Sequence, residues 1–193
     1  MERPPLARLI ARLVWGADIR RYYASMEEIG RVPDGGLIVD APCGAGVAFR
    51  GLRPEQRLRY LALDLSPAML GRARRRAARR GLGQIEFIEG DAQSIPIEGG
   101  SADLFLSYWG LHCFADPRAA LAEADRCLRP GGRLIGGTVV RGGSWRQRLI
   151  VRPHHGAFGS VGSAEEVRGW LGELFGEPEI ETSGAFIHFS AIK

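Results

Sequence analysis

The sequence predicts an α/β fold with a doubly wound, mostly parallel sheet, and two features of the chain lead to that prediction. Strand-like and helix-like patterns alternate from about residue 37 onward, as they do in βαβ units. Three successive strand patterns each lead into an aspartate, at Asp40, Asp64 and Asp91. Because open α/β sheets bind ligands at the carboxyl ends of their strands, the three acids predict a ligand site there.

Two helices are expected before the first strand. An apolar stripe at helical spacing predicts an amphipathic helix at the N-terminus, and Asp18–Ile29 is expected to form a second helix. The stripe consists of Leu6, Leu9, Ile10, Leu13 and Val14.

The first strand, expected over 37–42, opens a glycine-containing turn. Its apolar residues Leu37–Val39 are followed by the segment DAPCGAG, and a short helix is expected over 46–52. Gly44 and Gly46 are one residue apart, so the backbone can turn tightly and bring a ligand close to main-chain N–H groups. A tight structural turn explains the same pattern, and the segments that follow favour the ligand site.

The next elements are a strand, a helix and another strand. The strand 59–64 ends in Asp64, 24 residues after Asp40, where such an acid accepts hydrogen bonds from ribose hydroxyls in doubly wound folds. An ordinary surface aspartate at a strand end is the alternative. Ser66–Pro67 is a good start for a helix over 67–80, and a third strand is expected over 85–89.

The last elements continue the alternation and then change it. A strand over 103–108 precedes a helix over 117–128, which Asp116–Pro117 starts and Pro130–Gly132 stops, and a strand over 133–139. Ser163–Glu166 predicts a capping box for a final helix that reaches about Phe175. The closing runs Glu179–Ser183 and Ala185–Ile192 predict two strands joined by a tight turn at Gly184.

Length and composition favour one globular domain. The chain has 193 residues, of which 45% are hydrophobic, and we see no apolar run long enough to span a membrane. The segment Met1–Trp15 alternates arginine with apolar residues, so we expect neither a secretory signal peptide nor a location outside the cytoplasm.

The three cysteines are widely spaced. Cys43, Cys113 and Cys127 include no CxxC pair, which argues against a disulfide framework and a zinc site, and no metal is expected. Cys43 lies inside the glycine turn, where a small side chain suits packing beneath a ligand. A nucleophilic thiol is the less favoured interpretation.

The net charge of +4 raises the question of nucleic-acid binding. Much of it comes from arginines in the helix expected over 67–80, which buries the apolar residues Met69, Leu70, Ala73 and Ala77. A solvated helix face explains these arginines better than an RNA-binding patch. No nucleic-acid partner is expected. The arginines are Arg72, Arg74, Arg75, Arg76, Arg79 and Arg80.

Four segments in order resemble the class I S-adenosylmethionine-dependent methyltransferases, in particular the small-molecule type related to quinone-biosynthesis enzymes. They cover roughly residues 35–140: LIVDAPCGAG (37–46), LALDLSPAML (61–70), FIEGDAQSIPIEGGSADLFLSYWGLHCFADPRAAL (87–121) and LRPGGRLIGGTVV (128–140). One residue departs from the family pattern, which usually has glycine where this chain has Pro42. Proline fixes φ and removes a donor, so the turn must depend on Gly44 and Gly46.

The resemblance implies a Rossmann-like seven-stranded sheet, mostly parallel, with an antiparallel strand in the C-terminal hairpin. It implies a single domain over 1–193, which begins with a helical cap (1–30) and a cofactor-binding core (35–140). A substrate-side loop (141–162) and a closing helix with hairpin (163–193) complete it. The activity implied is methyl transfer from S-adenosylmethionine to O, C or N of a small-molecule acceptor by in-line displacement, with S-adenosylhomocysteine as the product.

The resemblance also implies which residues hold the cofactor. The acid Asp40 and the loop after it would hold the methionine portion, Asp64 the ribose hydroxyls, and Asp91 the adenine amino group. Ser107 and Tyr108 are expected near the methionine amino group. The other cofactor-binding residues are Ala41, Pro42, Gly44 and Gly46 in the loop, Leu65 and Met69 against the adenine, and Ala92 and Gln93 beside Asp91.

Methyl transfer needs an acceptor pocket and, for acceptors that hold their proton tightly, a general base. His112 is the candidate base, and a histidine that orients a loop is an equally good interpretation. The pocket is expected from Tyr22 and Tyr23, from Tyr108–Phe114 and from the loop 141–162. That loop carries Trp145, His154, His155 and Phe158, and its Arg146, Arg148 and Arg152 suit either an anionic acceptor or simple solubility.

Three alternatives were weighed against this activity. An enzyme that methylates base amino groups would show an Asn/Asp-Pro-Pro-aromatic run where this chain has Ser107–Gly110. A nicotinamide oxidoreductase would have a third glycine at the position of Phe49. A protein that binds S-adenosylmethionine or S-adenosylhomocysteine without turnover, in a regulatory or assembly role, remains open.

Overall fold

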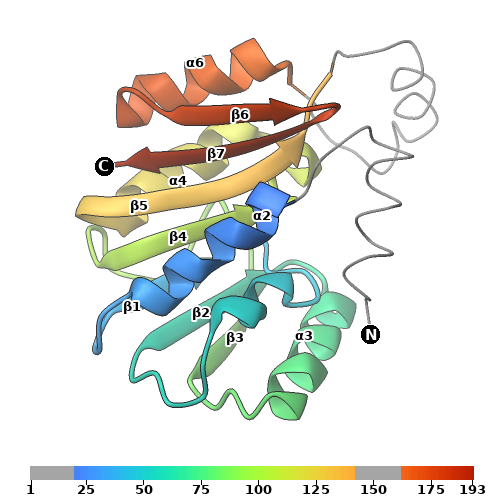
Figure 1. Ribbon diagram of the computed structural model, residues 1–193, viewed down its shortest axis with the longest axis vertical. Coiled ribbons are helices and arrows are strands. Elements are labelled where there is room, and N and C mark those ends of the chain that lie inside the picture. The colour runs from blue at the N-terminus through green and yellow to red at the C-terminus, as the bar shows by residue number, and fades with distance from the viewer. Residues whose placement is uncertain (1–19, 142–161) are drawn as a thin grey trace.

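Seven strands form one sheet in the computed structural model, which describes residues 20–141 and 162–193 (Figure 1). The strand order is β3-β2-β1-β4-β5-β7-β6. β2 and β3 are therefore added on one side of β1, and β4 and the later strands on the other side. The strands are β1 (Leu37–Asp40), β2 (Arg59–Asp64), β3 (Ile85–Glu89), β4 (Ala102–Tyr108), β5 (Leu128–Val139), β6 (Glu179–Ser183) and β7 (Phe186–Ile192).

The directions of the strands confirm the predicted sheet. The first five strands are mutually parallel, whereas β7 runs antiparallel to both of its neighbours, β5 and β6. The hairpin turn at Gly184 has a φ of 61°, a backbone conformation that favours glycine. The switch between β1 and β4 is where doubly wound sheets form their ligand crevice.

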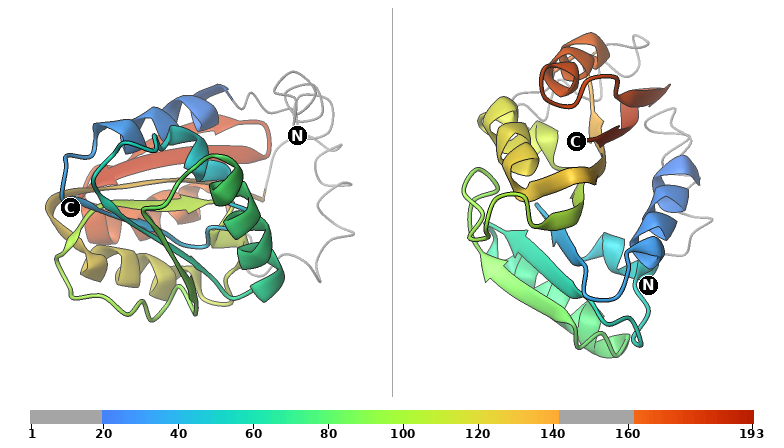
Figure 2. Two further views of the ribbon diagram at one scale, coloured as in Figure 1. Left: turned by 90° about the horizontal axis from the view of Figure 1, so that it is seen from below. Right: turned by 90° about the vertical axis from the view of Figure 1, so that its left-hand side faces the viewer.

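Helices cover the sheet on two sides, which Figure 2 shows edge-on in its right-hand view. One side carries α2 (Arg20–Ala24), the 3₁₀ helices η1 (Ser25–Arg31) and η2 (Val47–Gly51), and α3 (Pro67–Arg79). The other carries the 3₁₀ helix η3 (Leu111–Cys113), α4 (Pro117–Cys127) and α6 (Ala164–Phe175). Each side buries its own apolar cluster against the sheet.

The predicted helix starts are confirmed by the hydrogen bonds that satisfy the first backbone donors. The Ser66 hydroxyl accepts from the Met69 N–H, and the Asp116 carboxylate accepts from the two N–H groups of Arg118 and Ala119. Ser163 and Glu166 form the predicted capping box at α6.

Two predicted α-helices differ in the structure. In place of a helix over Asp18–Ile29, α2 ends at Ala24 and the chain continues as the 3₁₀ helix η1, because the Ser25 hydroxyl donates to the Tyr22 carbonyl and tightens that turn. The helix predicted over 46–52 is the 3₁₀ helix η2. A left-handed residue, Gly46, precedes it and Pro54 follows it closely, so no room is left for a regular α-helix.

Two strand boundaries also differ. β1 stops at Asp40, two residues earlier than predicted, because its regular pairing with β2 and β4 ends there. β5 starts at Leu128, five residues earlier than predicted, since Leu128 already pairs with Ala102. Helix α4 therefore ends before Pro130, and the following glycines bond to the C-terminal residue Lys193 instead of stopping a helix.

The predicted N-terminal amphipathic helix and the aromatic, histidine and arginine residues of the loop 142–161 lie outside the described residues. Within the described part of the chain, no helix combines the length and apolarity that a membrane crossing requires.

Candidate active site

The ends of β1 and β2 bring two of the predicted acids to one edge of the sheet. Asp40 pairs with Ala62 in the register, so Asp64 lies one pleat farther along the neighbouring strand. The loop after β1 is held between its neighbours, because the Ala41 N–H donates to the Leu106 carbonyl (2.9 Å) and the Cys43 N–H to the Leu63 carbonyl (2.8 Å).

The glycine turn depends on Gly44 and Gly46, whose φ angles of 53° and 74° are in the left-handed region. The peptide bond before Pro42 is cis. A Cβ added at Gly44 would meet nothing within 4 Å, whereas one at Gly46 would lie 2.3 Å from the Phe49 ring. The backbone at Gly44 is therefore open to close approach, while Gly46 packs against the core.

Asp64 links this loop to the start of α3. Its Oδ2 accepts from the Gly44 N–H (2.8 Å) and its Oδ1 from the Ser66 N–H (2.9 Å). Each carboxylate oxygen keeps a further lone pair for a ligand hydroxyl. Beside it Leu65 is 65% exposed and Met69 is half-buried, so apolar side chains border the acid.

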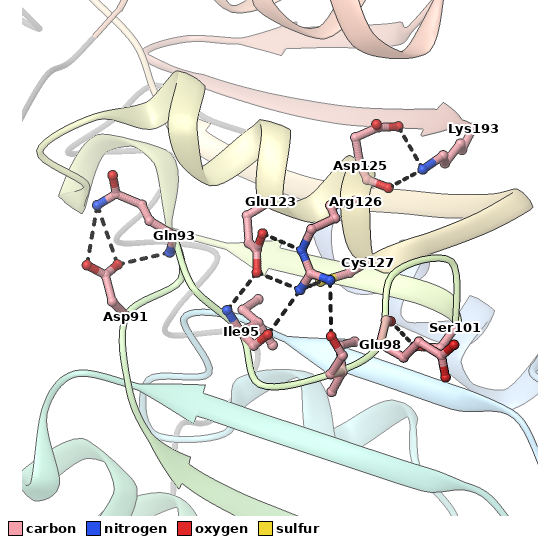
Figure 3. A network of polar contacts seen from close by, with 11 residues as sticks. Asp91, Gln93, Ile95, Glu98, Ser101, Glu123, Asp125, Arg126, Cys127 and Lys193 are labelled. Carbon is pink, nitrogen blue, oxygen red and sulfur yellow. Dashed lines mark hydrogen bonds and ion pairs between the residues drawn. The ribbon is translucent and has the colours of Figure 1, made fainter.

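Asp91 lies on the loop after β3, a few residues before the segment Ile95–Ile97 that hydrogen bonds hold to α4 (Figure 3). Its Oδ1 accepts from the Gln93 N–H at 2.9 Å, and the Gln93 side-chain amide reaches both carboxylate oxygens at 3.4 Å. Farther along, the Arg126 guanidinium donates to the Ile95 and Ile97 carbonyls (3.0 Å each). Helix α4 thereby holds the loop that carries Asp91.

Asp40 is the most enclosed of the three acids, at 1% exposure. Its Oδ2 accepts from the Tyr60 hydroxyl at 2.8 Å. Burial raises the pKa of Asp40 to about 8, while the Tyr60 hydrogen bond acts in the opposite direction and the nearby Asp64 raises the pKa further.

Ser107 and Tyr108 lie on opposite faces of β4, as alternation along a strand requires. The Tyr108 hydroxyl is 2.7 Å from the Ser25 hydroxyl on the side of α2 and η1. The buried Ser107 hydroxyl has no hydrogen-bond partner among the described residues. It lines an apolar cavity of about 10 Å³, about the room of one water molecule, on the side of α4. The structure therefore does not bring the two side chains together on one face.

Aromatic side chains gather where β4 ends. The Tyr22 ring contacts the rings of Tyr23, Tyr108, Trp109 and Phe186 edge-on, with centroids 4.9 to 6.1 Å apart. Trp109 has a φ of 59°, which a bulky residue rarely adopts. Its N–H donates to the Gly137 carbonyl at 2.8 Å, so the sheet holds it in that conformation.

His112 lies on η3 and is buried at 4% exposure. Its Nδ1 is 2.9 Å from the Thr138 hydroxyl, and the Val139 N–H donates to the same nitrogen at 3.4 Å. Burial lowers the pKa of His112 to about 4, so the ring is neutral at neutral pH.

Sequence reasoning missed Tyr60 and the conformation of Trp109. A tyrosine within an otherwise apolar buried strand was a usable signal for Tyr60, because a buried phenol needs a hydrogen-bond partner. No sequence signal marked Trp109, since its φ is set by the strand end and by the Gly137 carbonyl.

A family model described as "Methyltransferase domain" matches residues 39–136, just over half of the chain, from the end of β1 into β5. The chain belongs to this methyltransferase domain family. The match includes all three acids and the glycine turn.

Members of the methyltransferase domain family with curated names are similar over the same region. Demethylmenaquinone methyltransferase of Thermus thermophilus is 36% identical over 137 residues, which is 69% of this chain and 61% of that protein. Malonyl-[acyl-carrier protein] O-methyltransferase of Hahella chejuensis is 41% identical over 106 residues, which is 53% of this chain and 36% of that protein. The chain thus spans about one third to three fifths of the length of these two relatives.

A solved methyltransferase structure shares the fold. Geranyl diphosphate methyltransferase in complex with GPP and sinefungin aligns with a TM-score of 0.73 over 91% of this chain and 77% of that one. At 17% identity this similarity concerns the fold alone, and it agrees with the Rossmann-like sheet predicted from the sequence.

Proposed function

We propose that this protein transfers a methyl group from S-adenosylmethionine to a small-molecule acceptor. One observation carries the proposal. At the switch point of the sheet, an open left-handed turn at Gly44 is joined by a hydrogen bond to the carboxylate of Asp64. Membership of the methyltransferase domain family supports it, as does the shared fold with a methyltransferase that was solved with sinefungin.

The residues at this edge fit S-adenosylmethionine. The cofactor offers hydroxyl and amino donors, and Asp64 and Asp91 offer carboxylate acceptors at neighbouring strand ends. Leu65 and Met69 offer an exposed and a half-buried apolar side chain for the adenine. At Gly44 the absence of a side chain leaves the backbone open, and a Cβ there would extend into free space.

When bound, the cofactor supplies a methyl group on a sulfonium, which is already a good leaving group. The protein then has to hold the acceptor in line and exclude water. We assign the positioning of the cofactor to Asp40, Asp64, Asp91 and the loop 41–46, and the walls of the acceptor side to the aromatic rings around Tyr22 and Trp109.

We propose a positioning role for His112 in preference to the base role. Its Nδ1 accepts a backbone hydrogen bond, and its lowered pKa makes it a weak base. Cys43 has a packing role in this proposal, because burial raises the pKa of its thiol far above neutrality.

The acceptor is proposed only as a small molecule. The relatives named above are a demethylmenaquinone methyltransferase and an O-methyltransferase of malonyl-[acyl-carrier protein], two unlike acceptors. The three unpaired cysteines suit a reducing compartment, so we propose the cytoplasm as the location.

The test is calorimetric titration of the protein with S-adenosylmethionine, S-adenosylhomocysteine and NAD(H). We expect micromolar binding of the first two ligands and none of the third. Binding without turnover in a subsequent acceptor screen would favour the regulatory alternative. Absence of binding by both S-adenosyl ligands would overturn the proposal.

Asp64→Asn is the variant that tests the site itself. We expect the dissociation constant for S-adenosylhomocysteine to rise about tenfold or more, because an acceptor for the ribose becomes partly a donor. The variant also weakens the bonds from Gly44 and Ser66, so a thermal melt must show that it is folded. Asp34→Asn, which removes the same charge from an exposed loop, is the matched control and should bind normally.

A further inference from the structure

Among the residues that the structure describes, Asp40 is a buried carboxyl group without a cationic partner. It is 1% exposed, and its side chain accepts a hydrogen bond from the neutral Tyr60 hydroxyl. In the described part of the chain, no arginine or lysine forms an ion pair with it. A carboxylate in such surroundings is costly unless an opposite charge arrives.

Within residues 20–141 and 162–193, the titratable groups that face Asp40 are all neutral or negative. Tyr60 and Asp64 belong to β2, Tyr108 to β4, Tyr22 to α2, and Cys43 to the loop that follows Asp40. Burial raises the pKa of Tyr22, Tyr60, Tyr108 and Cys43 away from neutrality, so these groups keep their protons. None of them can supply the missing positive charge.

We propose that Asp40 is a neutral acid before the cofactor binds and becomes a carboxylate when the ammonium group of the cofactor binds beside the loop 41–46. The proton leaves the carboxyl group for the solvent, and the charge that remains pairs with the ammonium. This inference rests on the proposed function, because it needs a cofactor with a cationic end at this strand edge.

The size of the effect follows from the pKa of Asp40. With a pKa of about 8, about nine tenths of the molecules hold the proton at pH 7. An opposite charge within about 4 to 6 Å lowers a carboxyl pKa by roughly 1 to 3 units. Binding should therefore release between about 0.4 and 0.9 protons at pH 7.

Tyr60 is a positioning residue in this scheme. Its hydroxyl donates to Asp40 and lowers the pKa of that group, so the hydrogen bond favours ionisation. Removal of the hydroxyl should make Asp40 hold its proton more tightly and move the whole proton release to higher pH.

The experiment is titration calorimetry with S-adenosylhomocysteine at pH 7 in buffers of different ionisation enthalpy. The slope of the observed enthalpy against the buffer enthalpy counts the protons released. Asp40→Asn is the matched control, because its amide has a similar shape and no proton to lose, and any proton that the ligand itself exchanges cancels in the difference. We expect a difference of about 0.4 to 0.9 protons between the two proteins.

Binding by both proteins with the same proton count would overturn the inference and leave the proposed function intact. No binding by the natural protein would instead remove the proposed function. Should Asp40→Asn not fold, Tyr60→Phe provides the second measurement. In that variant the pH at which proton release falls to half should move upward, and an unchanged pH profile would count against the inference.

Discussion

Asp40 and His112 share one physical situation at the level of single residues. Both are buried near the carboxyl ends of strands, and each is shifted toward its uncharged form because burial disfavours charge. Burial raises the pKa of Asp40, so that the carboxyl group favours its protonated form. Burial lowers the pKa of His112, so that the imidazole favours its neutral form.

His112 should make the free energy of unfolding depend on pH in the acidic range. Its pKa is about 4 in the folded state and about 6.5 when unfolded, so the unfolded chain takes up a proton first. The contribution of neutral His112 to the free energy of unfolding is fully present above the pKa of the unfolded chain, about 6.5. It is lost as the pH falls from 6.5 toward 4, by on the order of 3 kcal/mol.

His112→Asn tests this dependence and the role of the residue together. The amide can replace the Nδ1 contact with Thr138 and has no titration, so the free energy of unfolding measured in urea should vary less between pH 6.5 and 4. If His112 only orients its loop, turnover should stay within about threefold. A loss of about a hundredfold or more would restore the base role.

Gly44 and Gly46 can be compared directly, because both have a left-handed backbone but only Gly46 has another side chain close to where its Cβ would lie. Gly44→Ala should cost about 1 to 2 kcal/mol, the backbone penalty alone. Gly46→Ala should cost at least about 1 kcal/mol more, since its Cβ would lie 2.3 Å from the buried Phe49 ring. Urea unfolding compares the two, and equal losses would contradict the crowding argument.

At the scale of elements, the loop between β3 and β4 is positioned by α4. The Arg126 guanidinium binds both oxygens of Glu123, at 2.7 and 2.8 Å, and two loop carbonyls, while the Glu123 Oε1 accepts from the Ile95 N–H at 2.7 Å (Figure 3). The ion pair is partly sheltered, and the Arg126 hydrogen bond is the main cause that lowers the pKa of Glu123. A helix and a loop thus act as one unit behind Asp91.

Arg126→Ala should release this loop. We expect a loss of about 2 kcal/mol in the free energy of unfolding, because the Ile95 and Ile97 carbonyls lose a charged donor. Hydrogen exchange should rise over residues 93–101 and the affinity for S-adenosylhomocysteine should fall modestly. Arg118→Ala, which breaks the exposed pair with Glu173, is the control and should cost less than about 1 kcal/mol. Equal exchange in the two variants would argue against the clamp.

At the scale of the whole molecule, charge is distributed unevenly. Six arginines lie between residues 72 and 80, more than the net charge of +4, so the rest of the chain carries −2. Arg72, Arg75, Arg76 and Arg79 follow one side of α3, and the helix contains no acidic residue. Leu70, Ala73 and Ala77 on its other side are buried, which confirms the predicted amphipathic arrangement, whereas Met69, also predicted to be buried, is half-buried.

Replacing those four arginines by glutamine tests whether the stripe has a partner. We expect the free energy of unfolding to change by less than about 0.5 kcal/mol and cofactor affinity to be unchanged, as for a solvated face. Neither protein should bind RNA saturably at about 0.15 M salt. Micromolar RNA binding that the variant loses would contradict our expectation that nucleic acid is not a partner.

The sequence by itself determined the sheet and the strand ends at which the three acids lie. Apolar runs that end in Asp40, Asp64 and Asp91, with helix starts at Ser66, Asp116 and Ser163, are local patterns, and local patterns survive into the fold because they concern residues close along the chain. Hydrophobic periodicity set the order of strands and helices, and the closing hairpin followed from two β-type runs around Gly184.

Only the tertiary structure decided which residues of the candidate site form hydrogen bonds with one another. That Tyr60 bonds to Asp40 and that Asp64 accepts from Gly44 both depend on which strands are neighbours and in which register. The close packing of η1 on η2 is likewise a tertiary contact, since a Cβ on Gly51 would lie 2.1 Å from the Met26 carbonyl oxygen. Such contacts join residues 20 or more positions apart, and their energies arise from burial and close packing, which no local pattern encodes.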